Sequence, residues 1–177
     1  MRSNIHEAYV RILRSELIAA TGCTEPIAIA YAAALARQAL GKMPEHCLVD
    51  CSGNIVKNVM GVTVPNSGGM KGIDVAAVLG LLGGRADRSL EVLEDVTPEE
   101  IEEAKVLLAQ GLCECRLVPN VENLYICIFV RAGRDSALVE IRGFHKNVTR
   151  IERNGEVLFQ SDQACREIGE EEAKKAD

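Results

Sequence analysis

Hydrophobic positions divide the chain into a helical first part and a strand-rich second part. Apolar side chains recur every three or four positions over residues 5–20, which predicts an amphipathic helix. Residues 25–40 are apolar on nearly every side and rich in alanine, as is typical of a helix at the centre of a core. Further helices are predicted over residues 73–82 and 98–110, whereas residues 54–64 begin with a helical pattern that then weakens.

Polar residues mark where two of these helices begin. Thr24 is the expected N-cap of the alanine-rich helix, with the Glu25 carboxylate in the first turn and Gly41 after the last. Thr97 and Glu100 have the spacing of a capping box, in which each side chain bonds the backbone of the other residue.

The second part of the chain is rich in valine and isoleucine with partial alternation, which is typical of strands. Strands are predicted over residues 113–118, 124–131, 136–141, 147–153 and 156–160, with a short one over residues 47–51. Asn154-Gly155 indicates a two-residue hairpin. We therefore predict an α+β fold, in which N-terminal buried alanine-rich helices pack with a C-terminal antiparallel β-meander. Residues 1–160 form one domain in this prediction, and residues 161–177 form an acidic helical or frayed tail.

The amino-acid composition argues against nucleic acid and membrane as binding partners. The chain has 177 residues, 20 basic and 26 acidic, for a net charge of −6, and it lacks tryptophan. Nucleic acid is therefore excluded as an expected partner, because phosphate binding needs clustered positive charge. No signal peptide and no apolar stretch long enough to cross a bilayer is present, so we expect a cytoplasmic protein without a membrane partner. The seven cysteines then favour thiols or metal ligands over disulfides.

Cys23 is the first candidate for chemistry. It lies just ahead of the N-terminus of the alanine-rich helix, where free backbone N–H groups and the helix dipole favour the thiolate that ligates metals. Gly22 lets the backbone turn sharply at this point. A buried thiol in an interhelical turn is the alternative, and position alone does not separate the two.

Two further segments carry polar groups at suggestive spacings. Asn54, Lys57 and Asn58 share one face if their segment is helical, and two amides with an ammonium suit an amino-acid carboxylate or another small anion. The alternative is a solvated helix face. Residues 65–72 contain three glycines, whose backbone N–H groups can hold an anion, although most such loops are only turns.

The remaining candidates lie in the strand-rich part. His145 falls in a loop between two predicted strands, where it is either a base or hydrogen-bonding group or an exposed loop histidine. Cys113 and Cys115 point to the same side of a strand. Packing is the favoured role for this pair, because a one-residue spacing supplies at most half of a metal site.

Taken together, these segments resemble the family of L-cysteine desulfidase and L-serine dehydratase alpha-chain-like proteins. The matching blocks follow the family's order: residues 22–26, residues 54–58 with 62–65 and the glycine loop, residues 76–80, and residues 145–147 with 151–155. Lys146 departs from the threonine usual in that family.

The resemblance implies an iron–sulfur lyase that eliminates a β-thiol or β-hydroxyl group from L-cysteine or L-serine, giving pyruvate, ammonia and sulfide or water. It implies a [4Fe–4S] cluster with Cys23 as one ligand, and Lys57 and His145 as catalytic residues. The residues that it assigns to substrate binding are Asn54, Asn58, Ser67, Gly68, Gly69 and Asn147.

The chain also departs from that family, because nothing in it resembles the C-terminal half that carries the other two cluster cysteines. A missing half or a separate subunit is therefore expected to complete the cluster, with a small amino acid as substrate. The alternative is a non-catalytic module for binding a small amino acid or anion, or for assembly. Apolar surface left by a missing half would favour a homodimer.

Overall fold

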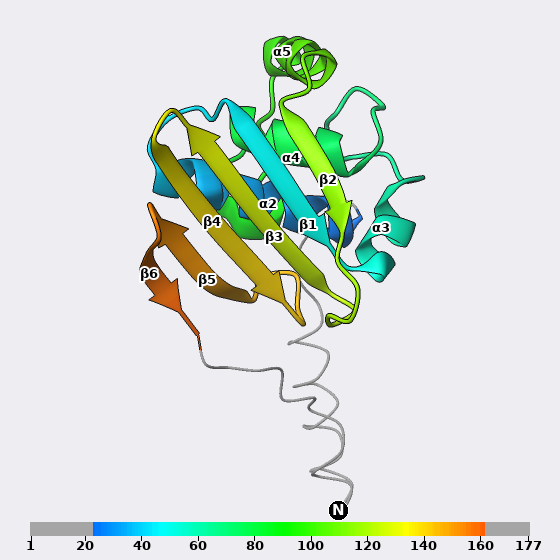
Figure 1. Ribbon diagram of the computed structural model, residues 1–177. Coiled ribbons are helices and arrows are strands. Elements are labelled where there is room, and N and C mark those ends of the chain that lie inside the picture. The colour runs from blue at the N-terminus through cyan, green and yellow to red at the C-terminus, as the bar shows by residue number, and fades with distance from the viewer. Residues whose placement is uncertain (1–22, 162–177) are drawn as a thin grey trace, which may run out of the picture.

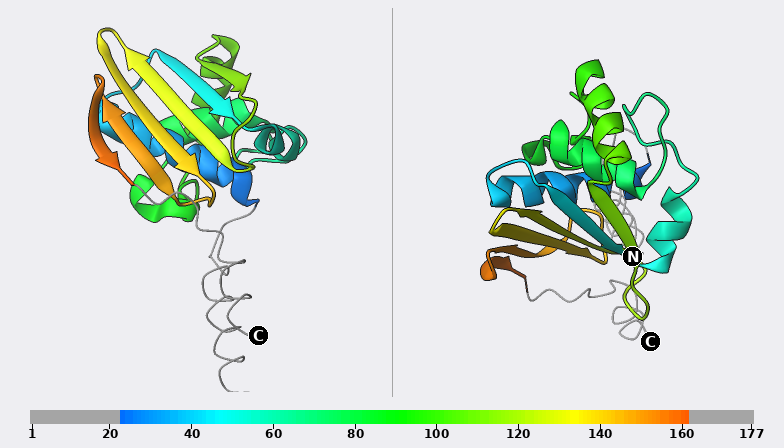
Figure 2. Two further views of the ribbon diagram at one scale, coloured as in Figure 1. Left: turned by 60° about the horizontal axis from the view of Figure 1, so that its bottom comes forward. Right: turned by 45° about the horizontal axis from the view of Figure 1, so that its top comes forward.

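The computed structural model describes residues 23–161 as an α+β fold in two layers. Six strands form one sheet, and the helices lie on one face of that sheet (Figure 1). Figure 2 shows the two layers from other directions. The predicted fold class is confirmed. The predicted helix over residues 5–20 and the tail from residue 162 onward lie outside the described residues.

Helix α2 (Thr24–Leu40) is the centre of the core, as its alanine-rich sequence predicts. Ten of its 17 residues are buried, and it packs against three strands of the sheet and against helix α4. Gly41 ends the helix in the left-handed conformation, and its N–H group donates to the Arg37 carbonyl. The N-cap is Cys23, one residue earlier than predicted, so Thr24 is the first helical residue.

Helix α4 (Ile73–Leu82) has the predicted boundaries and crosses α2 at very short range. A Cβ atom on Gly80 would lie 2.3 Å from the carbonyl oxygen of Ala30 in α2. Glycine is therefore required at this crossing, since any side chain would push the two helices apart. The contact is part of one continuous apolar core between the helices and the sheet.

Three further helices lie around this core: α3 (Gly53–Val59), the 3₁₀ helix η1 (Ala86–Glu91) and α5 (Pro98–Ala109). Helix α3 ends at Val59, five residues before the predicted end of its pattern. The predicted capping box of α5 is confirmed: Glu100 N–H donates to Thr97 Oγ1 at 3.3 Å, and Thr97 N–H donates to a Glu100 carboxylate oxygen at 2.9 Å.

The strands lie in the order β2-β1-β3-β4-β5-β6. Their bounds are β1 (His46–Cys51), β2 (Cys113–Leu117), β3 (Tyr125–Ala132), β4 (Asp135–Arg142), β5 (Val148–Arg153) and β6 (Glu156–Gln160). Strands β3 to β6 form the predicted antiparallel meander, but β2 instead pairs with β1 in parallel. The chain between β1 and β2 contains α3, α4, η1 and α5, which is the long connection that a parallel pair needs.

The Asn154-Gly155 hairpin between β5 and β6 is also confirmed. Both residues have positive φ, 52° and 80°, as a two-residue turn between antiparallel strands requires. The Asn154 side chain strengthens this turn, because its Oδ1 accepts from Ser136 N–H at 2.8 Å.

The two faces of the sheet differ sharply. Alternate residues such as Val49, Ile128 and Val139 face the helices and are fully buried. Residues of the opposite face include the ion pair of Asp50 with Arg116, and no helix in residues 23–161 covers it (Figure 1). Among the described helices, none combines the length and the apolar character that crossing a membrane requires.

Candidate functional site

Side chains from two distant parts of the sequence meet where α2 begins. Cys23 Sγ donates a hydrogen bond to Glu25 Oε2 at 3.2 Å. His145, in the loop between β4 and β5, places its Nε2 atom 3.9 Å from Glu25 Oε1. We call Cys23, Glu25 and His145 the Cys–Glu–His cluster. It brings two residues that the sequence singled out, Cys23 and His145, to the same carboxylate.

The start of α2 explains why Cys23 and Glu25 face each other. Cys23 has extended backbone angles as the N-cap, but its side chain caps no helical N–H group. The thiol instead donates to the carboxylate two residues later, and the Thr24 hydroxyl donates weakly to the same oxygen at 3.4 Å. Glu25 is therefore held by donors from its own helix end, in the first turn, where a negative charge is favourable.

The expectation of a thiolate at Cys23 is wrong. Partial burial raises the pKa of the Cys23 thiol, and the hydrogen bond to the Glu25 carboxylate raises it further. The backbone N–H of Glu25 opposes this change without reversing it. Burial and the nearby carboxylate together keep Cys23 a neutral thiol at neutral pH.

The other two members of the cluster differ in charge: Glu25 is ionised and His145 is neutral at neutral pH. Burial on its own would raise the pKa of Glu25, but hydrogen bonds, above all from Cys23, hold this pKa below its usual value. Burial lowers the pKa of His145, and the Glu25 carboxylate only partly opposes this effect. At neutral pH a charged carboxylate therefore faces a neutral imidazole.

The Nε2 atom of His145 is the unusual atom of the site. It is buried and has no hydrogen-bond partner within residues 23–161. The 3.9 Å separation from Glu25 Oε1 is too long for a hydrogen bond. A buried polar atom without a hydrogen-bond partner lowers the stability of the fold, and a bound ligand or water would remove this cost.

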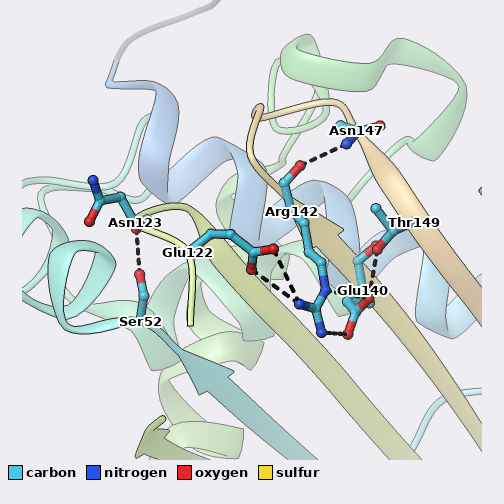
Figure 3. A network of polar contacts seen from close by, with 7 residues as sticks. All are labelled: Ser52, Glu122, Asn123, Glu140, Arg142, Asn147 and Thr149. Atoms are coloured by element: carbon cyan, nitrogen blue, oxygen red, sulfur yellow. Dashed lines mark hydrogen bonds and ion pairs between the residues drawn. The ribbon is translucent and has the colours of Figure 1, made fainter. Parts of the chain in front are cut away.

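The loop that carries His145 is held in place by its neighbours. Asn147 Nδ2 donates to the carbonyl oxygen of Arg142 at 2.8 Å and closes the loop on itself (Figure 3). Arg142 is held in turn by the carboxylates of Glu140 and Glu122, and its guanidinium lies 4.8 Å from the centre of the Tyr125 ring. The unpaired imidazole is therefore presented by an anchored loop.

The second predicted segment lies on α3. Asn54 and Lys57 are exposed and Asn58 is partly exposed, on a helix that packs against α2. Within the described residues, no hydrogen bond or ion pair links these three side chains to the Cys–Glu–His cluster. Their predicted role in binding remains a prediction.

The glycine loop of residues 65–72 uses its polar groups for its own structure. Asn66 Nδ2 donates to the carbonyl oxygens of Leu93 and Glu94, at 2.9 Å and 3.1 Å. Ser67 is buried, and its hydroxyl donates to the Met70 carbonyl oxygen at 3.0 Å.

Gly68 and Gly69, the predicted anion-holding glycines of this loop, both have positive φ. A Cβ atom on Gly68 would contact Ile101 of α5, so the loop packs toward that helix. In the part of the chain that the structure describes, no hydrogen bond joins the loop to the Cys–Glu–His cluster. The structure gives Ser67, Gly68 and Gly69 no contact that indicates a ligand.

The other cysteines of residues 23–161 lie in the sheet. Cys47 of β1 is paired in register with Cys113 of β2, and Cys51 and Cys127 are buried. Burial is the main cause that raises the pKa of Cys127 to about 12, so this thiol is neutral at neutral pH. Across residues 23–161, no group of three or more histidine, cysteine, aspartate or glutamate side chains is arranged to hold a metal ion.

Sequence reasoning missed the residue at the centre of the site. Glu25 was assigned only to the first turn of the helix, whereas it joins the thiol to the imidazole. Its position between Thr24 and Pro26 was visible, but its approach to His145, 120 residues later, depends on the β4–β5 loop reaching the start of α2.

The chain is similar to proteins that carry the name UPF0597 protein. It is 46% identical over 158 residues to one from Lachnoclostridium phytofermentans, and 45% identical over 155 residues to one from Treponema denticola. A third, from Finegoldia magna, is 46% identical over 151 residues. These alignments cover 85–89% of the chain but only 36–38% of each relative, so the chain spans little more than a third of their length.

No family profile matches the chain. No solved structure matches it.

These relatives overturn the expected assignment to the L-cysteine desulfidase and L-serine dehydratase family, because they are named UPF0597 proteins. We therefore withdraw the iron–sulfur lyase activity, which rested on that resemblance alone. The described residues also do not fit a cluster site: Cys23 stands apart from the sheet cysteines, as a neutral thiol bonded to Glu25. Completion of a cluster by residues outside this chain stays a prediction.

Proposed function

We propose that the start of α2 binds a small molecule through an ammonium group, of which an α-amino acid is the simplest example. The ammonium lies between Glu25 and His145 and donates to Glu25 Oε1 and to His145 Nε2. The observation that carries this proposal is the buried Nε2 atom without a hydrogen-bond partner.

The distances support an ammonium in this position. Hydrogen bonds between charged nitrogen and oxygen atoms are about 2.7–2.9 Å long. A nitrogen at roughly that distance from two atoms that are 3.9 Å apart fits between them as the apex of a triangle. The bound group would then satisfy Nε2 and bring a positive charge to the Glu25 carboxylate.

The charge states of the cluster favour a cation over an anion. Glu25 stays ionised because its pKa is held below the usual value, and burial lowers the pKa of His145, so the imidazole is neutral. With its proton on Nδ1, the neutral imidazole accepts at Nε2. The Cys23 thiol donates to Glu25 and adds no charge. A carboxylate ligand at the same point would be repelled by Glu25.

The carboxylate of an amino acid would have to be held elsewhere. Asn54, Lys57 and Asn58 of α3 are the predicted candidates for this, and Lys57 is exposed and has no ion pair among the described residues. In this proposal Lys57 holds the carboxylate electrostatically and His145 accepts a hydrogen bond.

A calorimetric titration with three probes tests the proposal: L-alanine, ethylammonium and acetate. We expect L-alanine to bind with a Kd of about 1 mM, ethylammonium to bind more weakly, and acetate not to bind. Glu25→Gln should weaken L-alanine binding about tenfold or more, because it removes the charge that pairs with the ammonium.

Glu99→Gln is the matched control, since Glu99 occupies the same second position of α5 and is exposed. It should bind L-alanine as the unsubstituted chain does. Equal binding of L-alanine by the Glu25→Gln variant would contradict the proposal.

We also propose that two copies of the chain associate through β6. Val157, Leu158 and Phe159 are all exposed on this edge strand, which has no strand on its outer side among the described residues. Exposed apolar edge strands favour pairing with another chain.

Sedimentation should show a dimer that Leu158→Lys dissociates, while Leu117→Lys on the opposite edge leaves it intact. A monomer at all concentrations would contradict this.

A further inference from the structure

A hollow lies at the opposite end of α2 from the Cys–Glu–His cluster. It has a volume of about 420 Å³ and is open to solvent on one side. The last turn of α2 and the segment that leads into η1 form its walls. Its lining includes Arg37, Gly41, Lys42, Gly84, Arg85 and Asp87.

Arg37 is the fixed positive charge of this hollow. Its Nη1 atom donates to the carbonyl oxygens of Leu81 and Leu82, at 2.6 Å and 2.5 Å, which holds the guanidinium at the end of α4. These carbonyls orient the group but do not neutralise it. No acidic side chain lies within ion-pair distance of Arg37 among residues 23–161, although the side chain is only partly exposed.

Other cations surround the same space. Lys42 and Arg85 line it, and Asp87 is the only acidic residue that residues 23–161 contribute to its lining. Lys42 is paired with Asp135, whereas Arg85 contacts Asp95 loosely, with 3.8 Å between Nε and Oδ2.

A fourth cation approaches at the rim of the hollow. Arg153 Nη2 lies 3.9 Å from the position of a Cβ atom on Gly41. With the carboxylates of Asp87, Asp95 and Asp135 counted, these four cations leave a small local excess of positive charge, whereas the chain as a whole carries a net charge of −6.

We propose that this hollow binds a dianionic oxyanion, in particular the phosphate group of a small phosphorylated molecule. Guanidinium groups pair with two oxygens of a phosphate at once, which suits the preoriented Arg37 and the loosely paired Arg85. Clustered charge beside a protein wall also concentrates the field on an anion. The volume of about 420 Å³ lies in the range of small-molecule pockets, so it leaves room for more than the phosphate itself.

The hollow is independent of the ammonium site. The 17 residues of α2 separate the two ends by about 25 Å, and no residue lines both. Binding at one end can therefore be measured without the other.

Titration of the full chain with inorganic phosphate at constant ionic strength tests the proposal, with the amide NMR signals of Gly41 and Gly84 as reporters. Saturable shifts at millimolar phosphate, absent with chloride, are expected. Arg85→Gln should weaken binding by about five- to tenfold, because it removes one charge-assisted partner. Arg37→Gln should weaken it further, and its melting temperature shows whether the variant is folded.

Arg88→Gln is the matched control, because Arg88 belongs to η1, pairs with Glu94 and Asp95, and does not line the hollow. Its phosphate binding should equal that of the unsubstituted chain. Phosphate shifts that do not saturate, or equal weakening by Arg88→Gln and Arg85→Gln, would overturn the proposal.

Discussion

Two polar regions of the molecule, the glycine loop and the Cys–Glu–His cluster, have different roles in the structure. In the glycine loop, Asn66 and Ser67 donate to backbone carbonyls, so each side chain has a partner within the protein. In the Cys–Glu–His cluster, Cys23 has a partner, whereas His145 presents a buried nitrogen that has none. The glycine loop uses its hydrogen bonds to stabilise its own conformation, whereas the cluster leaves one nitrogen atom for a ligand to bond.

The type of a polar residue is therefore a weaker guide to binding than whether its polar atoms have hydrogen-bond partners within the protein. A buried polar group that is fully paired adds about 1 kcal/mol per bond to stability. A buried group without a partner lowers stability unless a ligand or water supplies one. Substitutions in the two segments should therefore affect different properties of the protein.

The largest effect on stability should come from the loop. Asn66→Ala removes two hydrogen bonds to Leu93 and Glu94 and places alanine at a φ of 52°, a region that asparagine tolerates better. The free energy of unfolding should fall by about 2–3 kcal/mol, measured by urea denaturation. L-Alanine binding should be unchanged.

Asn120→Ala is the control for that substitution. Asn120 also has positive φ, 59°, but its side chain is exposed and makes no hydrogen bond among the described residues. Its loss should lower the free energy of unfolding by about 1 kcal/mol or less. Equal destabilisation by the two variants would show that the side-chain bonds of Asn66 contribute nothing.

The next effect should be on binding, at the cluster. His145→Ala removes an atom that has no partner, so the free energy of unfolding should change by less than about 0.5 kcal/mol. L-Alanine binding should weaken about tenfold, because the ammonium loses one acceptor. A large loss of stability with unchanged binding would reverse the roles that we give to the two segments.

Binding should also depend on pH in a defined direction. Burial lowers the pKa of His145, so the folded chain takes up a proton there less readily than the unfolded chain does. Both stability and ammonium binding are then greatest with neutral His145, and both fall as the pH drops below the usual histidine range. Affinity should fall several-fold between about pH 7 and pH 5. A His145→Gln variant should lose this dependence, which calorimetry at the two pH values checks.

The smallest effect should follow Cys23→Ser. The serine hydroxyl can donate to Glu25 as the thiol does, and neither group is charged at neutral pH. L-Alanine affinity should change by less than about threefold, in contrast to the loss expected for Glu25→Gln. A tenfold loss would mean that the sulfur itself contacts the ligand.

Local sequence signals predicted much of the fold. The alanine-rich α2, the boundaries of α4, the capping box of α5 and the Asn154-Gly155 turn all depend on neighbouring residues, and the structure confirms them. The parallel pairing of β1 with β2 depends on how several helices pack between them, which periodicity does not report.

The same limit applied to the site. Cys23 and His145 were visible as candidates, but their shared contact with Glu25 joins the start of α2 to a loop far along the chain. The charge of the thiol depends on the same packing, since burial and the Glu25 carboxylate both raise the pKa of Cys23.

The most direct test of the ammonium site is the ¹⁵N NMR signal of His145 Nε2 during a titration with ethylammonium at neutral pH. We predict a saturable upfield movement as Nε2 accepts a hydrogen bond, with no such movement on addition of acetate and none in the Glu25→Gln variant. An Nε2 signal that stays unchanged at saturating ethylammonium would contradict the central claim.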